Sequence, residues 1–120
     1  MQKTVLLAAT LLAWTGTAWA ADDVKVVGEA AWKKFNCASC HGADAKTPLN
    51  PDYPILAGQH ADYLRQSLMA YQRGQAGAPA TANIRKNAVM GAMAASLGQA
   101  DIDSISVWLA SLPGPLSTHK

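Results

Sequence analysis

Hydrophobic residues recur along the chain with helical spacing, and no segment shows the period-two alternation of a half-buried strand. The clearest helix is predicted over residues 60–73, where Leu64, Leu68 and Tyr71 fall at positions i, i+4 and i+7. Gly74 stands where the glycine that ends such a helix is expected. The pattern therefore predicts an all-α chain with this helix near its middle.

Three further segments have helical patterns of different strength. The strongest covers residues 101–112, and the proline and glycine residues at 113–115 end it. Its apolar stripe consists of Ile102, Ile105, Leu109 and Leu112. Residues 24–35 form a second candidate, with an apolar face of Val24, Val27, Ala31 and Phe35. A shorter helix is expected over 89–96, after an uncharged, glycine-rich surface loop at 74–83. The domain then has three to four short helices and long loops, which need something to pack on.

The first twenty residues have the pattern of an export signal. Lys3 is their only charge, an apolar stretch follows it, and Ala18 and Ala20 place small residues at the −3 and −1 positions of a cleavage site. An uncleaved anchor is the alternative, but the 17 uncharged residues at 4–20 are at the short end for a membrane span. We therefore expect a signal peptide at 1–20 and a periplasmic domain at 21–120.

The composition excludes several classes of protein. Charged residues make up 15% of the chain and apolar types 50%, which fits neither a disordered tail nor a nucleic-acid module with a basic stripe. The formal net charge is +2, and loss of Lys3 with the leader leaves +1, so no strong preference for anionic partners follows. Two cysteines are too few for a multi-disulfide framework or a four-cysteine zinc site.

The two cysteines belong to the run CASCH at 37–41, which matches C-x-x-C-H, the signature for covalent attachment of c-type haem. Cys37 and Cys40, spaced in this way, can reach the two vinyl groups at one porphyrin edge from a single helical turn. The adjoining His41 can then donate an imidazole nitrogen to the iron. Since the motif follows an export signal, we expect one covalent haem c with its iron.

Three other uses of the cysteines are weaker. A thioredoxin-like redox pair needs a βαβ context, and no strands are predicted. A zinc site needs further cysteine or histidine ligands, and only His60 and His119 remain. A disulfide between Cys37 and Cys40 would close a loop too short to add much stability.

The sixth position of the iron has several candidate ligands. Methionine is the usual partner of histidine in cytochromes c, and Met90 and Met93 both follow the glycine-rich loop and precede the last helix. Met69 lies beside the apolar stripe of a helix, where core packing is expected. His60 follows His41 by only 19 residues, which makes the opposite face awkward to reach. An open sixth site remains a further alternative.

Longer segments of the chain match a known family. These are CASCHG at 37–42, YPILAGQHADYL at 53–64, RKNAVM at 85–90 and ADIDSISVWLASLPGP at 100–115. With them the chain resembles class I c-type cytochromes, in particular the small bacterial periplasmic monohaem type whose domains also occur in dihaem proteins. The resemblance covers nearly all of residues 24–115 and implies the class I cytochrome c fold, with short helices and long loops around one haem.

The resemblance implies a role for each residue on the proximal side. Cys37 and Cys40 would carry the thioether bonds, and His41 would be the proximal iron ligand. Pro54 occupies the position whose backbone carbonyl accepts a hydrogen bond from the ligand imidazole, which fixes the ring. Leu56 would pack on the proximal face.

On the distal side, the resemblance implies Met90 as the second iron ligand, because it keeps the family's spacing to Leu97. Tyr63 has two alternative roles, which are packing and contact with a haem carboxylate. Arg85 and Lys86 also have two, because they are either a solvated pair or neighbours of those carboxylates.

The expected function is electron transfer, because an iron with two strong axial ligands has no room for a substrate. Redox partner proteins would dock transiently at the haem edge, over a small area. An electron-accepting subunit of a periplasmic dehydrogenase complex is the main alternative, and a sensor or peroxidase with an open sixth site is a weaker one. The mature chain is expected to be a monomer or such a subunit, without a membrane span or a nucleic-acid partner, and not itself an enzyme.

Overall fold

The structure, a computed structural model, describes residues 20–118, and within this range it contains helices and no strands. The elements are α1 (Ala20–Lys34), α2 (Ala38–His41), α3 (Ala61–Gln75), the 3-10 helix η1 (Ala80–Ala82), α4 (Ala88–Ala95) and α5 (Gln99–Ser111). The all-α prediction is confirmed for this part of the chain. Five α-helices replace the three to four expected, because α2 is a single turn and is too short to show a hydrophobic period. The predicted signal peptide lies outside the described residues, apart from Ala20.

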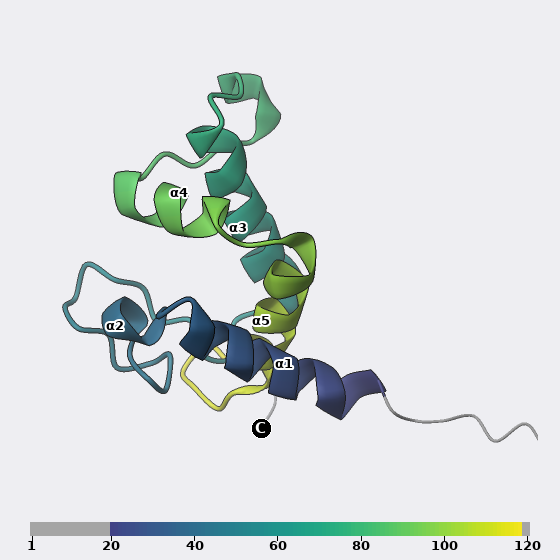
Figure 1. The fold of residues 1–120 in the computed structure, drawn as a ribbon. Helices are drawn as coiled ribbons and strands as arrows, with labels where there is room; N and C mark the ends of the chain where they lie inside the picture. Colours follow the sequence, from purple (N-terminus) through teal and green to yellow (C-terminus); the bar gives the residue numbers. More distant parts are fainter. Residues whose placement is uncertain (1–19, 119–120) are drawn as a thin grey trace, which may run out of the picture.

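The helices form two packed pairs, and one contact between α3 and α5 joins the pairs. Helix α5 packs against α1, α4 packs against α3, and α3 and α5 are also in contact. Figure 1 shows α1 and α5 crossing in the lower part of the view, with α3 and α4 above them and α2 to the side of α1. Helix α5 therefore joins the part of the molecule that contains α1 to the part that contains α4.

The contact between α1 and α5 centres on two tryptophans. The rings of Trp32 and Trp108 lie 5.4 Å apart between centroids, at an interplanar angle of 49°, and both residues are buried. A Cβ at Gly28 would overlap the backbone carbonyl of Ser104, so glycine lets the two helices approach closely. The predicted apolar face of α1 is wrong in one respect. Val27 is 55% exposed, because the side that includes Gly28 faces α5 instead.

Helix α3 ends later than predicted. It continues through Gly74 to Gln75, and the first glycine with positive φ after it is Gly77, at 76°. A Cβ at position 74 would overlap the carbonyl oxygen of Arg85, which passes directly over this turn of the helix. The glycine at 74 thus permits close packing of the returning chain and does not act as a helix-ending residue.

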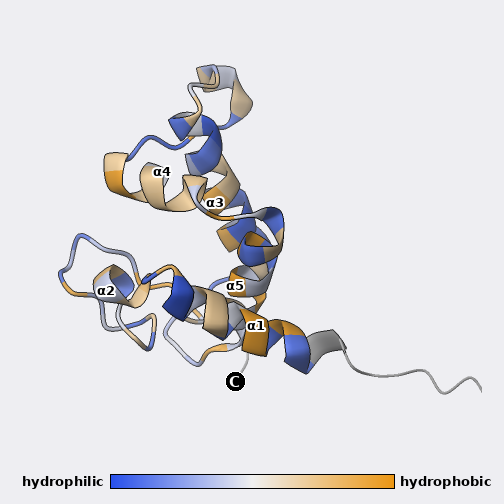
Figure 2. Ribbon diagram, viewed as in Figure 1, coloured by the Kyte–Doolittle hydropathy of each residue, from blue (hydrophilic) through white to orange (hydrophobic). Residues whose placement is uncertain are grey.

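Helices α4 and α5 each begin with a side-chain hydrogen bond. The Asn87 side chain accepts hydrogen bonds from the backbone N–H groups of Val89 and Met90, at 3.0 and 2.9 Å, and so caps α4. The backbone N–H of Gly98 donates to the Asp101 carboxylate at 2.9 Å, at the start of α5. Figure 2 shows that α4 is apolar along its length, whereas α3 has alternating polar and apolar bands. A short apolar helix of this kind depends on its neighbours for stability.

The loop between α2 and α3 is held by the backbone of Ala45. This residue has a φ of 56°, is fully buried, and accepts hydrogen bonds from the N–H groups of Leu56 and Ala57 at 2.8 and 3.0 Å. The N–H of Gly58 then donates to the carbonyl of Leu109 in α5, at 2.9 Å. The long loop therefore has a defined path that places residues 53–57 beside α2.

Candidate functional site

A cavity of about 720 Å³ lies between the two helix pairs, and every helix from α1 to α5 contributes to its wall. Much of the wall consists of apolar or aromatic side chains. These side chains include Trp32, Phe35, Tyr53, Leu56, Leu64, Leu68, Tyr71, Ile105 and Leu109. Protein pockets for cofactors and drug-sized ligands usually measure about 300–1,000 Å³ and are lined mainly by such residues. The cavity is thus large and apolar enough to enclose a cofactor.

The two cysteines lie at the wall of this cavity on the single turn α2. Cys37 is the residue that precedes α2, and its carbonyl accepts hydrogen bonds from the N–H groups of Cys40 and His41, at 3.3 and 3.1 Å. Both thiols are free and partly buried. Burial is the largest influence on the pKa of the Cys37 thiol and raises it above its usual range. The turn brings two thiols and an imidazole to one wall of the cavity.

The imidazole of His41 is buried and fixed in orientation. Its Nδ1–H donates to the backbone carbonyl of Pro54 at 3.0 Å, and the rings of Trp32 and Tyr53 each lie 6.1 Å from it between centroids. With a proton on Nδ1, the neutral ring presents Nε2 as its free lone pair. Histidines that bind metals are typically held in this way by a backbone carbonyl. The hydrogen bond implied by the family resemblance is present in the structure.

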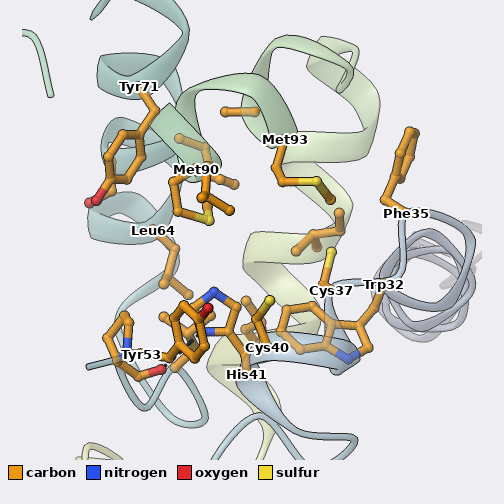
Figure 3. Close-up of a pocket in the computed structure, with 18 of the residues that line it drawn as sticks. Trp32, Phe35, Cys37, Cys40, His41, Tyr53, Leu64, Tyr71, Met90 and Met93 are labelled. Atoms are coloured by element: carbon orange, nitrogen blue, oxygen red, sulfur yellow. Dashed lines mark hydrogen bonds between the residues drawn. The ribbon is translucent and has the colours of Figure 1, made fainter. Parts of the chain in front are cut away.

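Two methionines line the opposite wall. Met90 and Met93 lie one turn apart on α4, and both contribute to the cavity. In Figure 3 the Met90 sulfur points towards His41, whereas the Met93 sulfur points towards Cys37 and Phe35. This orientation favours Met90 over Met93 as a partner for the His41 imidazole.

The other two candidates for the distal position lie away from the cavity wall. Met69 packs against the hydrophobic core, as predicted. His60 is exposed at the start of α3 and does not line the cavity.

Helix α4 is held against α3 at its C-terminal end by Gln72. The Nε2 group of Gln72 donates to the carbonyls of Ala94 and Leu97, at 2.9 Å each. Ala94 lies in the last turn of α4 and Leu97 lies two residues beyond its end, so these bonds fasten the C-terminal end of α4 to α3. The sequence analysis did not identify Gln72, because a glutamine beside the apolar stripe of a helix has no distinctive pattern.

The segment before α4 is fixed to α3 as well. The Arg73 guanidinium donates twice to the carbonyl of Asn83, at 3.1 and 2.9 Å. The Arg85 N–H donates to the carbonyl of Ala70 at 3.0 Å, close to Gly74. Both ends of α4, and with them the methionines, are therefore positioned by α3.

Arg85 also contributes its side chain to the cavity wall. One guanidinium nitrogen, Nη2, donates to the Tyr63 hydroxyl at 3.0 Å. The guanidinium carbon lies 5.4 Å from the ring centroid of Tyr63 and 5.7 Å from that of Tyr71, within the range of cation–π contacts. The hydrogen bond to Arg85 is the main cause that lowers the pKa of the Tyr63 hydroxyl.

The donor set fits a covalently attached haem. Two free thiols and an imidazole lie on one wall, and two thioether sulfurs lie on another. Within residues 20–118, no group of three or more histidine, cysteine, aspartate or glutamate side chains is arranged to hold a metal ion. The thiols suit attachment of a porphyrin edge, and one nitrogen and one sulfur are available for the iron, so the cavity has the chemistry of a porphyrin site.

Within residues 20–118, no helix is both long and apolar enough to cross a membrane.

Comparison with protein families agrees with this reading of the cavity. The family model described as Cytochrome c matches residues 26–113, which include all five side chains just described as thiol, imidazole or thioether donors. The match also spans four complete helices, α2 to α5, and most of α1. The class I cytochrome c fold expected from the resemblance is thus supported over almost the whole described chain.

Three relatives extend the comparison to individual proteins. The "Thiosulfate dehydrogenase electron acceptor" of Stutzerimonas stutzeri is 31% identical over 109 residues, which are 91% of this chain and 46% of the relative. "Cytochrome c4" of the same species is 34% identical over 115 residues, 95% of this chain and 52% of the relative. "Cytochrome c-554(548)" of Halomonas halodenitrificans is 41% identical over 78 residues, 62% of this chain and 82% of the relative. The chain spans about half the length of the first two.

Proposed function

The chain belongs to the cytochrome c family, and from this membership we propose that it transfers electrons through one covalently bound haem c with histidine and methionine as iron ligands. The observation that carries the proposal is a convergence of donors. Two thiols, an imidazole with a free Nε2 and the Met90 thioether all line the same cavity. The thiols and the imidazole lie at or directly before α2, and the thioether lies on α4.

 Helix α2 ends at His41 and α4 begins at Ala88, so only the folded chain brings these donors together.

The proximal residues each have a distinct task in this proposal. The Sγ atoms of Cys37 and Cys40 form the thioether bonds, and Nε2 of His41 binds the iron. The Pro54 carbonyl keeps the imidazole in one tautomer and one orientation through its hydrogen bond to Nδ1. Leu56, which lines the cavity beside this loop, packs on the proximal side and keeps water from the imidazole.

Met90 supplies the second iron ligand. The bound haem provides a one-electron couple, and a thioether ligand favours its reduced form. Two strong axial ligands leave no coordination position for a substrate, so the chain acts as a carrier and not as an enzyme. The residues of the chain orient the haem and exclude water from it, and they thereby set its reduction potential.

Export and partners complete the proposal. Residues 1–20 act as a signal peptide, and residues 21–120 function in the periplasm as a cytochrome c domain. The redox partners are proteins that dock transiently at the exposed haem edge, because fast electron transfer needs a small interface that separates quickly. Neither nucleic acid nor a membrane span of the mature chain has a part in this function.

A second candidate is an electron-accepting subunit of a periplasmic dehydrogenase complex. It is favoured by one observation, the similarity to the protein named Thiosulfate dehydrogenase electron acceptor. The haem chemistry of the two candidates is the same. They differ in whether the chain leaves its electron donor between turnovers.

The decisive experiment uses the exported protein purified from the periplasm. Intact mass spectrometry under denaturing conditions should give residues 21–120 plus one haem. A spectroelectrochemical titration should follow a reversible one-electron curve, in which each tenfold change in the ratio of oxidised to reduced protein takes about 59 mV. A mass equal to the bare chain would contradict the proposal. Co-purification of a dehydrogenase in fixed stoichiometry would favour the subunit over the free carrier.

A further inference from the structure

Helix α1 has an outer side that the rest of the described chain leaves exposed. Its inner side faces α5, where Gly28 and Trp32 make the close contacts. On the outer side Val26 is 68% exposed, and Val27 beside it is 55% exposed. In Figure 1 the N-terminal half of α1 extends beyond the other helices. Two valines of this helix are therefore in contact with solvent after residues 20–118 have folded.

Four exposed residues form a stripe along the outer side. Asp23, Val26, Ala30 and Lys34 are all exposed, and their spacing of i, i+3, i+7 and i+11 places them on one side of a helix. Figure 2 shows the middle of α1 as apolar, between polar segments near its two ends. This outer stripe thus has an acid near its N-terminal end, two apolar residues in the middle and a base at its C-terminal end.

The two charges of the outer stripe have no oppositely charged partner within the described residues. The ion pairs inside α1 join two other acidic residues to two other lysines. None of the ion pairs within residues 20–118 includes Asp23 or Lys34. The Lys34 ammonium lies 4.9 Å from the centroid of the neighbouring Phe35 ring, a contact that does not neutralise its charge. Both charges are therefore available to a group outside this chain.

We infer that a second copy of this chain covers the outer stripe, with the two α1 helices packed antiparallel across a two-fold axis. Asp23 of each copy then lies opposite Lys34 of the other, and Val26 lies opposite Ala30, so every contact occurs twice. Removal of the valines from water favours this association. The charges select the antiparallel direction, because a parallel pair would bring like charges together.

The size of the contact predicts a weak pair in equilibrium with the monomer. Helix α1 has 15 residues and is therefore about 22 Å long. One such helix from each copy covers less than the about 1,200–2,000 Å² of surface that stable interfaces bury. No residue of the outer stripe lines the cavity, so the contact does not use the haem site. The inference therefore goes beyond the proposed electron transfer and does not depend on it.

The test is sedimentation velocity of the exported holoprotein at low salt, from micromolar to millimolar concentration. The sedimentation coefficient of the parent should rise with concentration towards that of a dimer. Asp23→Lys places lysines at both ends of the stripe, and Lys34→Asp places aspartates there. Each variant should raise the dissociation constant by about tenfold or more, since both ends of its pair become repulsive. An equimolar mixture of the two variants should associate as the parent does, because every charge in the mixed pair then meets its opposite.

The double variant Asp23→Lys/Lys34→Asp separates contact between copies from an effect within the helix. An acid near the N-terminus and a base near the C-terminus also suit the helix dipole. If the charges act only within α1, the double variant should be the most impaired of the set. If they act between copies, it should associate as the parent does. Lys46→Asp, at an exposed position in the loop between α2 and α3, changes the net charge as Lys34→Asp does and should leave association unchanged.

Val26→Ser tests the apolar part of the contact with all charges kept, and it remains available if a charge variant fails to fold. It should weaken association, and haem absorbance per chain together with helical circular dichroism should match the parent. A parent that is monomeric at every concentration would overturn the inference and leave a different protein as the occupant of this face. Association that neither the single charge reversals nor Val26→Ser weakens would also overturn it, because the copies would then meet elsewhere. Absence of covalent haem would contradict the proposed function alone.

Discussion

His41 and Pro54 are joined by a hydrogen bond of 3.0 Å between an imidazole Nδ1–H and a backbone carbonyl. Because the acceptor belongs to the backbone, Pro54→Ala should keep this bond and retain haem. The loss of ring rigidity should lower the free energy of unfolding by about 0.4–1 kcal/mol. His41→Ala should give no stable holoprotein, since the ligand and the attachment motif are both lost. Haem absorbance per chain and thermal unfolding measure the two effects, and complete loss of haem in Pro54→Ala would show that its role is misread.

The two methionines of α4 can be told apart by spectroscopy. A thioether bound to ferric iron gives a weak far-red band, and a firmly bound ligand prevents carbon monoxide from binding to the reduced form near neutral pH. Met90→Ala should lose the band and bind carbon monoxide, whereas Met93→Ala should behave as the parent does. Exchanged phenotypes would identify Met93 as the ligand. Binding of carbon monoxide by the parent would indicate an open site and favour a sensor or peroxidase.

The two hydrogen bonds from Gln72 to the end of α4 should affect both the stability of the protein and the binding of methionine to the iron. Gln72→Leu removes a donor from the carbonyls of Ala94 and Leu97, and the Ala94 carbonyl keeps only backbone donors such as the Leu97 N–H. The loss of these two bonds should cost about 1–3 kcal/mol. Since α4 then loosens, the far-red band should disappear at a lower temperature than in the parent. The same substitution at the exposed Gln66 of α3 is the control and should change neither property. An equal effect at both positions would contradict the role of Gln72 in holding α4 against α3.

Gly74 tests the close approach of the chain to α3. In an ordinary helix interior, replacement of glycine by alanine stabilises by about 1 kcal/mol. Here the new Cβ would overlap the Arg85 carbonyl, so Gly74→Ala should instead destabilise the protein by about 1–3 kcal/mol. Denaturant unfolding of the holoprotein gives the sign directly. A stabilised variant would mean that the segment around Arg85 does not lie against α3.

The sequence predicted the helices in which the apolar stripe repeats over several turns. The stripes of Leu64 and Leu68, and of Ile105 and Leu109, correctly indicated α3 and α5. It did not predict α2, because a single turn carries no period. It also misplaced the buried side of α1, since a close helix contact selected Gly28 and left Val27 exposed.

Prediction of the site divides in a similar way. The C-x-x-C-H run is local, so its spacing alone placed two thiols and an imidazole together. The distal wall depends on contacts between α3 and α4 that are distant in sequence, such as Gln72 with Leu97. Helical spacing could not separate Met90 from Met93, because residues three apart lie on the same side of a helix. Only the resemblance to the family, through the spacing to Leu97, favoured Met90. Side-chain orientation, which only the folded chain provides, favours Met90.

The packing of Trp32 against Trp108 has an optical consequence. The chain contains four tryptophans, and two of them, Trp14 and Trp19, precede the expected cleavage site. All tryptophan fluorescence of the mature protein then comes from the pair at the contact of α1 and α5, and Trp32 also lies 6.1 Å from the His41 ring. Energy transfer to the porphyrin should quench this emission almost completely. Its recovery during denaturation would report the separation of the first and last helices from the haem, without any added label.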